Sequence, residues 1–107
     1  MKQERISTHV LDLSSGRPAA GLRVSLFQGD RLVGSGETDA GGRIADLAEQ
    51  PLAAGAYRLV FEVGAYFGER EHLFRTVALE VDLRAPVRHH HLPLLIAPFS
   101  STAYRGS

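Results

Sequence analysis

The residues best suited to chemistry in this 107-residue sequence are histidines in two segments that read as β-strands. His9 lies in the first alternating segment, and a triplet ending at His91 opens a later one. Imidazole titrates near neutral pH, so it can take a proton from water and return it to a leaving nitrogen. His9 and His91 are therefore a candidate acid–base pair. Spacing alone equally allows the histidines to be unrelated surface side chains.

Side-chain alternation decides which of these histidines can meet, because successive residues of a strand point to opposite faces. Every second residue from His90 to Ile96 is expected to face the core, whereas His89 and His91 take the outer face. His9 likewise lies on the outer face of its strand, together with a serine and a leucine. An outer face that carries leucines is often covered by a partner subunit. If the two strands are neighbours, His9 and His91 converge in a cleft at such an interface.

The same histidines could instead bind a metal ion. His89 and His91 would form a chelate on one side of a strand, with His9 as a third ligand. No Asp or Glu stands beside the triplet to orient such ligands. The sequence has no cysteine, which excludes thiolate metal sites and disulfides. Ser7 belongs to no Gly-x-Ser-x-Gly motif, so a serine nucleophile is not indicated.

Three further residues are candidates for binding a substrate. Arg43 follows the Gly41-Gly42 turn, and its rigid fork of donors suits a planar anionic substrate. Tyr104 can donate a hydrogen bond into a pocket, and the carboxylate of Ser107 can pair with a cation or a histidine. The alternatives are an ordinary surface arginine and a last strand that packs its tyrosine.

Composition predicts one soluble globular domain spanning residues 1–107. Hydrophobic residues make up 44% and charged residues 22%, and twelve basic residues balance twelve acidic ones. This balance argues against nucleic-acid or membrane-surface binding, and it leaves association between copies unopposed by charge. The sequence shows neither a secretory signal nor an apolar run of membrane-spanning length, so we expect a cytoplasmic protein.

The elements that must position these residues are short strands separated by turn residues. Strands are predicted at 6–12, 22–28, 31–38, 43–45, 57–63, 77–83, 89–96 and 102–107. The segment 65–71 loses the alternation and is predicted as two turns of helix, although Gly68 inside it is unfavourable. About eight strands and one short helix predict an all-β sandwich of two packed antiparallel sheets.

Several motifs follow one another along the sequence. They are Ser-Thr-His-Val-Leu-Asp at 7–12, Gly-Arg-Pro-Ala-Ala-Gly at 16–21, Thr-Asp-Ala-Gly-Gly-Arg at 38–43, Tyr-Arg-Leu-Val-Phe at 57–61, Gly-Ala-Tyr-Phe at 64–67, His-Leu-Pro-Leu-Leu at 91–95 and Tyr-Arg-Gly-Ser at 104–107. Together and in this order, they resemble the 5-hydroxyisourate hydrolases, transthyretin-related enzymes of urate breakdown. The resemblance covers nearly the whole chain.

That resemblance implies a transthyretin-like sandwich assembled as a homotetramer, with active sites at the dimer–dimer interface. It implies hydrolysis of 5-hydroxyisourate to 2-oxo-4-hydroxy-4-carboxy-5-ureidoimidazoline, with no metal or other cofactor. Catalysis would fall to His9, Arg43 and His91, and substrate binding to Arg43, Tyr104 and Ser107. One histidine would activate a water that attacks the C6 carbonyl, and Arg43 would stabilise the oxyanion. Which histidine is the base stays open.

Two positions depart from the family pattern. Ala103 stands where the family usually carries a threonine, so a hydroxyl contact to substrate from this position is missing. His90 stands where a tyrosine is common, and its predicted inward direction indicates a structural role. Other functions remain possible for such a fold, namely a transthyretin-type carrier of aromatic hormones, a metal-binding module or a purely structural sandwich.

Overall fold

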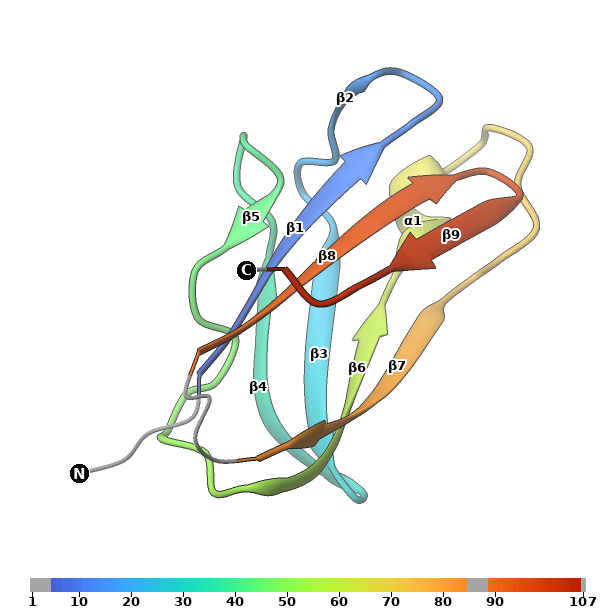
Figure 1. Ribbon diagram of the computed structural model, residues 1–107. Coiled ribbons are helices and arrows are strands. Elements are labelled where there is room, and N and C mark those ends of the chain that lie inside the picture. The colour runs from blue at the N-terminus through green and yellow to red at the C-terminus, as the bar shows by residue number, and fades with distance from the viewer. Residues whose placement is uncertain (1–4, 85–88, 107) are drawn as a thin grey trace.

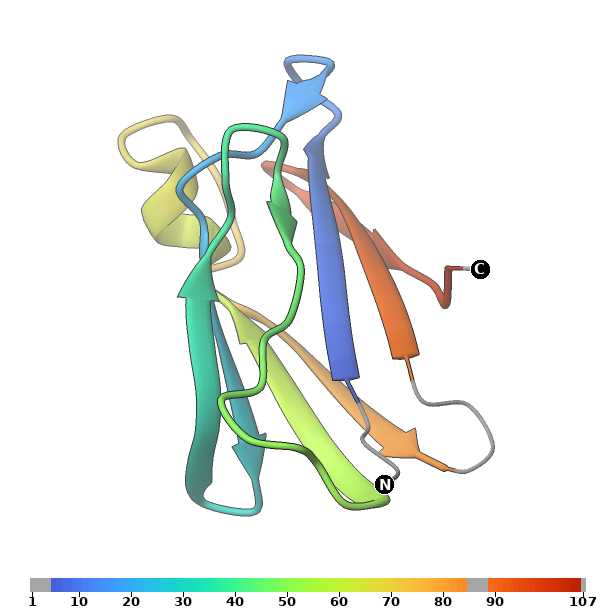
Figure 2. The same cartoon turned by 90° about the vertical axis from the view of Figure 1, so that its left-hand side faces the viewer.

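The computed structural model describes residues 5–84 and 89–106, which form two stacked β-sheets (Figures 1 and 2). The strands of the first sheet lie in the order β2 (Arg17–Pro18), β1 (Arg5–Asp12), β8 (His89–Ala97) and β9 (Ser100–Ala103), with β5 (Arg43–Ile44) also paired to β1. Those of the second sheet lie in the order β4 (Arg31–Glu37), β3 (Arg23–Gln28), β6 (Gly55–Phe61) and β7 (Val77–Leu83). The helix α1 (Val63–Phe67) follows β6. This architecture confirms the predicted fold class.

One strand pairing differs from the antiparallel expectation. β1 and β8 run parallel, from Arg5 opposite His89 to Asp12 opposite Ile96. Parallel neighbours require a long crossover, and here the whole second sheet lies between the two strands in the sequence. The prediction of purely antiparallel sheets is therefore wrong for this pair, which forms the centre of the first sheet.

The core lies between the two sheets and follows the predicted alternation. Its fully buried side chains include Ile6, Val10, Val24, Leu26, Leu59, Phe61, Leu94 and Ile96. Burying such a side chain contributes about 1.5–3 kcal/mol, so the alternating pattern fixes which face of each strand turns inward. His90 is buried as predicted. The inward residues of β7 are mostly half-buried, because β7 is an edge strand.

The helix begins and ends earlier than the predicted 65–71. Gly68 follows α1 as its C-cap with φ 64°, and its N–H donates to the carbonyl of Gly64. A glycine at positive φ is a common helix terminator, so Gly68 ends the helix where the prediction placed it inside. Within the described residues, no helix combines the length and apolar character needed to cross a membrane.

Candidate active site

The parallel pairing of β1 and β8 brings the predicted histidines onto one face of the first sheet. The register places Ser7 opposite His91 and His9 opposite Pro93. His9 and His91 are therefore two positions apart on adjacent strands and share the outer face. Both side chains are half-buried. The condition behind the predicted convergence, that the two strands are neighbours, is confirmed.

Arg43 joins these histidines from β5, where it lies directly opposite His9. The turn before it is fixed by Asp39, whose Oδ1 accepts hydrogen bonds of 2.9 Å from two backbone N–H groups of the turn, including that of Arg43. Gly42 adopts φ 77°, and a Cβ there would clash with the carbonyl oxygen of Val10. Only glycine allows this close approach to β1. The Gly-Gly-Arg sequence thus sets the guanidinium beside the histidine strand.

Arg43 and His91 line an open cleft of about 430 Å³ on the outer face of the first sheet, whereas His9 is not among its lining residues. Its walls come from β1, β5, β8 and the turn before β5, and its lining residues are Arg5, Ser7, Thr8, Asp39, Arg43, Ile44, Ala45, His89 and His91. Such a volume suits a small-molecule ligand. Arg43 is exposed there and makes no ion pair with any carboxylate in 5–84 or 89–106. Its charge is available for an anionic ligand.

The surroundings of His91 favour its neutral form. Partial burial is the largest cause that lowers the pKa of His91, and electrostatic interactions with His89, His9 and Arg43 lower it further. A neutral imidazole can accept a proton, so this environment suits a general base.

Ser7 is a site residue that the sequence pattern did not single out. Its Oγ lies 2.8 Å from Nδ1 of His91 and 2.8 Å from Nε2 of His89. Its position on the same strand face as His9 was the available signal. The sequence motifs only excluded Ser7 as a nucleophile and indicated no other role for it. Among the described residues, no cluster of three or more His, Cys, Asp or Glu side chains is placed to hold a metal ion.

The C-terminal segment runs along the outer face next to His91. The predicted last strand, 102–107, is displaced, because β9 ends at Ala103. Gly106 then pairs with β8 through a 2.7 Å hydrogen bond from its N–H to the carbonyl of His91. Tyr104 is 53% exposed, which contradicts the alternative of a packed tyrosine within this chain. Ser107 lies outside the described residues.

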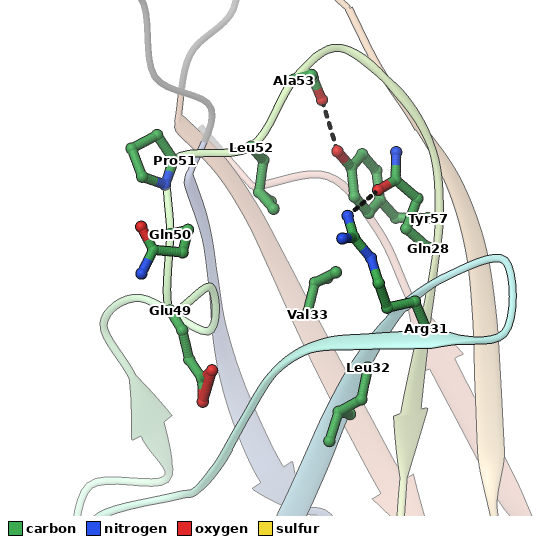
Figure 3. Close-up of a pocket in the computed structure, with 10 residues that line it drawn as sticks. All are labelled: Gln28, Arg31, Leu32, Val33, Glu49, Gln50, Pro51, Leu52, Ala53 and Tyr57. Atoms are coloured by element: carbon green, nitrogen blue, oxygen red, sulfur yellow. Dashed lines mark hydrogen bonds between the residues drawn. The ribbon is translucent and has the colours of Figure 1, made fainter.

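A second hollow of about 320 Å³ lies beside the turn between β3 and β4 (Figure 3). Two of its polar side chains are engaged within the hollow: Arg31 donates to Gln28 at 3.1 Å, and the Tyr57 hydroxyl donates to the carbonyl of Ala53 at 2.7 Å. No predicted catalytic or substrate-binding residue lines it. The histidine cleft is therefore the better candidate for chemistry.

Comparison with known proteins gives consistent matches. A sequence model of the HIUase/Transthyretin family, where HIUase abbreviates 5-hydroxyisourate hydrolase, matches residues 6–106. The 5-hydroxyisourate hydrolase of Mesorhizobium japonicum is 42% identical, over 96% of this chain and 92% of the relative. The structure of Klebsiella pneumoniae 5-hydroxyisourate hydrolase aligns with a TM-score of 0.90 and 42% identity, over 97% of this chain and all of the other. Sea bream transthyretin in complex with thyroxine aligns with a TM-score of 0.87 and 27% identity, over 95% of this chain and 94% of the other.

Proposed function

The chain belongs to the HIUase/Transthyretin family, and we propose that it is a 5-hydroxyisourate hydrolase whose chemistry is carried by His9, Arg43 and His91. It opens 5-hydroxyisourate to 2-oxo-4-hydroxy-4-carboxy-5-ureidoimidazoline. The observation that carries this function is that two histidines share one sheet face with an arginine that has no ion pair among the described residues. The hydrolase relatives, at 42% identity, favour it over the carrier function suggested by a transthyretin at 27%.

In this mechanism, His91 is the base and removes a proton from water. The water oxygen adds to the C6 carbonyl carbon, and Arg43 stabilises the charge that develops on the carbonyl oxygen. The C6–N1 bond then breaks with its electron pair going to nitrogen, and His9 protonates that nitrogen. His91 is assigned as base because its surroundings keep it neutral. Each positioned acid or base of this kind contributes about 10²–10⁴-fold to the rate.

We assign substrate contacts to Tyr104 and Ser107 in addition to Arg43. The exposure of Tyr104 supports this assignment, because its hydroxyl is available to a ligand or to a second subunit. We also propose that residues 1–107 form one catalytic domain in a cytoplasmic homotetramer, with active sites at the dimer–dimer interface. The half-buried Leu11 and Leu95 on the outer face support association there. Sedimentation velocity and cell fractionation test these proposals, and a monomeric active enzyme would contradict the interface.

A coupled ultraviolet assay tests the function. Urate and urate oxidase generate 5-hydroxyisourate in situ, and its absorbance decay is followed with the protein, with and without chelator. We expect acceleration that survives the chelator. His9→Asn and His91→Asn should each lower turnover by orders of magnitude in a folded protein, whereas His72→Asn is the matched control outside the cleft. Decay at the spontaneous rate would contradict the hydrolase, and full activity in either site variant would remove that histidine from the mechanism.

A further inference from the structure

Ser7 joins His89 and His91 into a hydrogen-bonded chain that the mechanism above does not use. Its Oγ lies 2.8 Å from a ring nitrogen of each histidine, and the serine is only 6% exposed. The strand register explains this contact, because Ser7 lies directly opposite His91 and His89 precedes His91 by two residues on the same face. The arrangement is therefore built by the backbone of β1 and β8.

A hydroxyl group carries one hydrogen, so Ser7 can donate to only one of the two ring nitrogens. If both contacts are hydrogen bonds, Ser7 donates to one histidine and accepts from the other. In the first arrangement, His91 donates its Nδ1–H to Ser7, and Ser7 donates to the bare Nε2 of His89. In the second, His89 donates its Nε2–H, and Ser7 donates to the bare Nδ1 of His91. The tautomers of the two histidines are therefore coupled.

The two arrangements present opposite chemistry to the cleft. In the first, the remaining nitrogen of neutral His91, Nε2, is bare and can accept a proton. In the second, Nε2 of neutral His91 carries the hydrogen and cannot act as a base. A positively charged His89 has a hydrogen on Nε2 and must donate it, which selects the second arrangement.

We propose that Ser7 is a positioning residue that, together with a neutral His89, holds His91 in the tautomer with Nε2 bare. This inference rests on the proposed role of His91 as the base. When Nε2 takes a proton from water, one O–H bond breaks, one N–H bond forms and hydroxide adds to the carbonyl carbon. Nδ1–H stays on His91 and still donates to Ser7, so the chain accommodates the charged ring without rearranging.

Ser7 and His89 therefore take the place of an orienting carboxylate. In hydrolases with a serine–histidine–aspartate triad, the aspartate fixes the histidine tautomer by accepting its Nδ1–H. No carboxylate of the described residues forms an ion pair with His91. The charged and titratable groups around His91 are His89 on β8, His9 and Arg5 on β1, Arg43 on β5 and Asp39 before it. Since most of them are cationic or can become so, a neutral acceptor chain must fix the ring.

Kinetics of Ser7 variants give the first test. Ser7→Ala should lower kcat by about tenfold to a hundredfold, the usual cost of a misplaced catalytic group, with KM within about twofold of the unmodified enzyme. Ser7→Thr keeps the hydroxyl and should restore most of the loss. Ser25→Ala removes a strand serine from the other sheet and is the matched control. A rise in KM at unchanged kcat, or full activity in Ser7→Ala, would overturn the proposal.

Nitrogen-15 NMR of the histidine rings gives a second test that does not depend on activity or on any variant. At neutral pH, we expect His91 to carry its hydrogen on Nδ1 and to leave Nε2 bare. A neutral His91 with a bare Nδ1 at neutral pH would overturn the proposal.

His91→Asn in the kinetic series separates the role of Ser7 from the role of His91 as the base. If it is inactive while Ser7→Ala is fully active, only the role of Ser7 fails; if it is fully active, the assignment of the base fails.

Discussion

β1 carries a buried polar cluster near each end, and the two clusters are bonded in different ways. Near one end, Asp12 is 1% exposed and accepts hydrogen bonds from the N–H and hydroxyl of Ser14, from the hydroxyl of Tyr66 and from Arg70. Near the other, a single hydroxyl on Ser7 serves two histidines. The Asp12 cluster has a donor for each carboxylate oxygen, whereas the Ser7 cluster has a hydrogen that can lie in two places.

The different bonding of the two clusters also affects the protonation of their titratable side chains. Burial alone raises the pKa of Asp12, but the hydrogen bonds from Ser14, Tyr66 and Arg70 outweigh it and lower the pKa to about 2. Burial and the bond to this carboxylate raise the pKa of Tyr66. Both groups therefore keep one charge state around neutral pH, while His91 is held neutral by burial and by neighbouring cations. A saturated cluster supports the fold, and a cluster with a movable hydrogen suits catalysis.

The largest effect on activity is expected from a charge reversal beside the Ser7 cluster. Arg43→Glu removes the group that stabilises the oxyanion, and we expect kcat/KM to fall by about 10²–10³-fold. The side chain is exposed and forms no ion pair in the described parts of the chain, so thermal stability should change little. The coupled assay and a thermal melt measure both quantities. Activity within tenfold of the unmodified enzyme would exclude Arg43 from catalysis.

The opposite outcome is expected at the structural end. Asp12→Asn replaces a charged acceptor of several hydrogen bonds, and we expect a loss of about 2–3 kcal/mol in the free energy of unfolding. Activity per folded molecule should stay close to that of the unmodified enzyme. Urea denaturation measures the loss, with Asp30→Asn, in an exposed turn, as control. A stable Asp12→Asn protein with impaired turnover would reverse the roles of the two clusters.

Acid should weaken the fold through Asp12. Its pKa is lower in the folded state than in the unfolded chain, so the unfolded chain binds a proton at higher pH and protonation favours unfolding. This stabilisation is fully present above about pH 4 and is lost as the pH falls towards 2. It contributes about 2 kcal/mol to the free energy of unfolding. Denaturation midpoints between pH 2 and 6 measure it, and Asp12→Asn should remove this part of the slope. An equal slope in the variant would point to other carboxylates.

The smallest effect is expected from Gly106→Ala at the tail. A Cβ at Gly106 would lie 2.6 Å from Cδ2 of His91, so either the tail or the ring must shift. We expect kcat/KM to fall a few-fold with little change in the melting temperature. Gly36→Ala is the control, because its Cβ would meet only Ile44 at ordinary distances of 3.6 and 3.7 Å. Equal kinetic constants in the two variants would show that the tail does not influence the position of His91.

The sequence predicted what depends on local patterns. Alternation placed His90 inward and His9 outward, because each strand has one face in the core. The Gly-Gly turn before Arg43 was also visible in the sequence, and the structure supplies its reason, because the close backbone approach at Gly42 requires glycine. The candidate residues were found chiefly through a family resemblance, and their catalytic roles stay a prediction.

Features that depend on pairing between distant segments were not predicted. The parallel direction of β1 and β8 leaves no mark on either strand alone, so the contact of Ser7 with two histidines could not be foreseen. The same holds for Asp12, whose partners Tyr66 and Arg70 lie on and just after the helix. The tail was predicted as a strand because its spacing does not reveal that Gly106 pairs with His91 as an isolated bridge.

The pairing of β1 with β8 affects the order in which the chain can fold. Ser7 and His91 are 84 residues apart in the sequence, and contacts of such separation form slowly because a long loop must first close. During synthesis, β1 cannot take its place beside β8 until β8 itself has left the ribosome. The cleft thus comes into being only when the first sheet closes, so hydrolytic activity cannot appear during refolding before that sheet is complete.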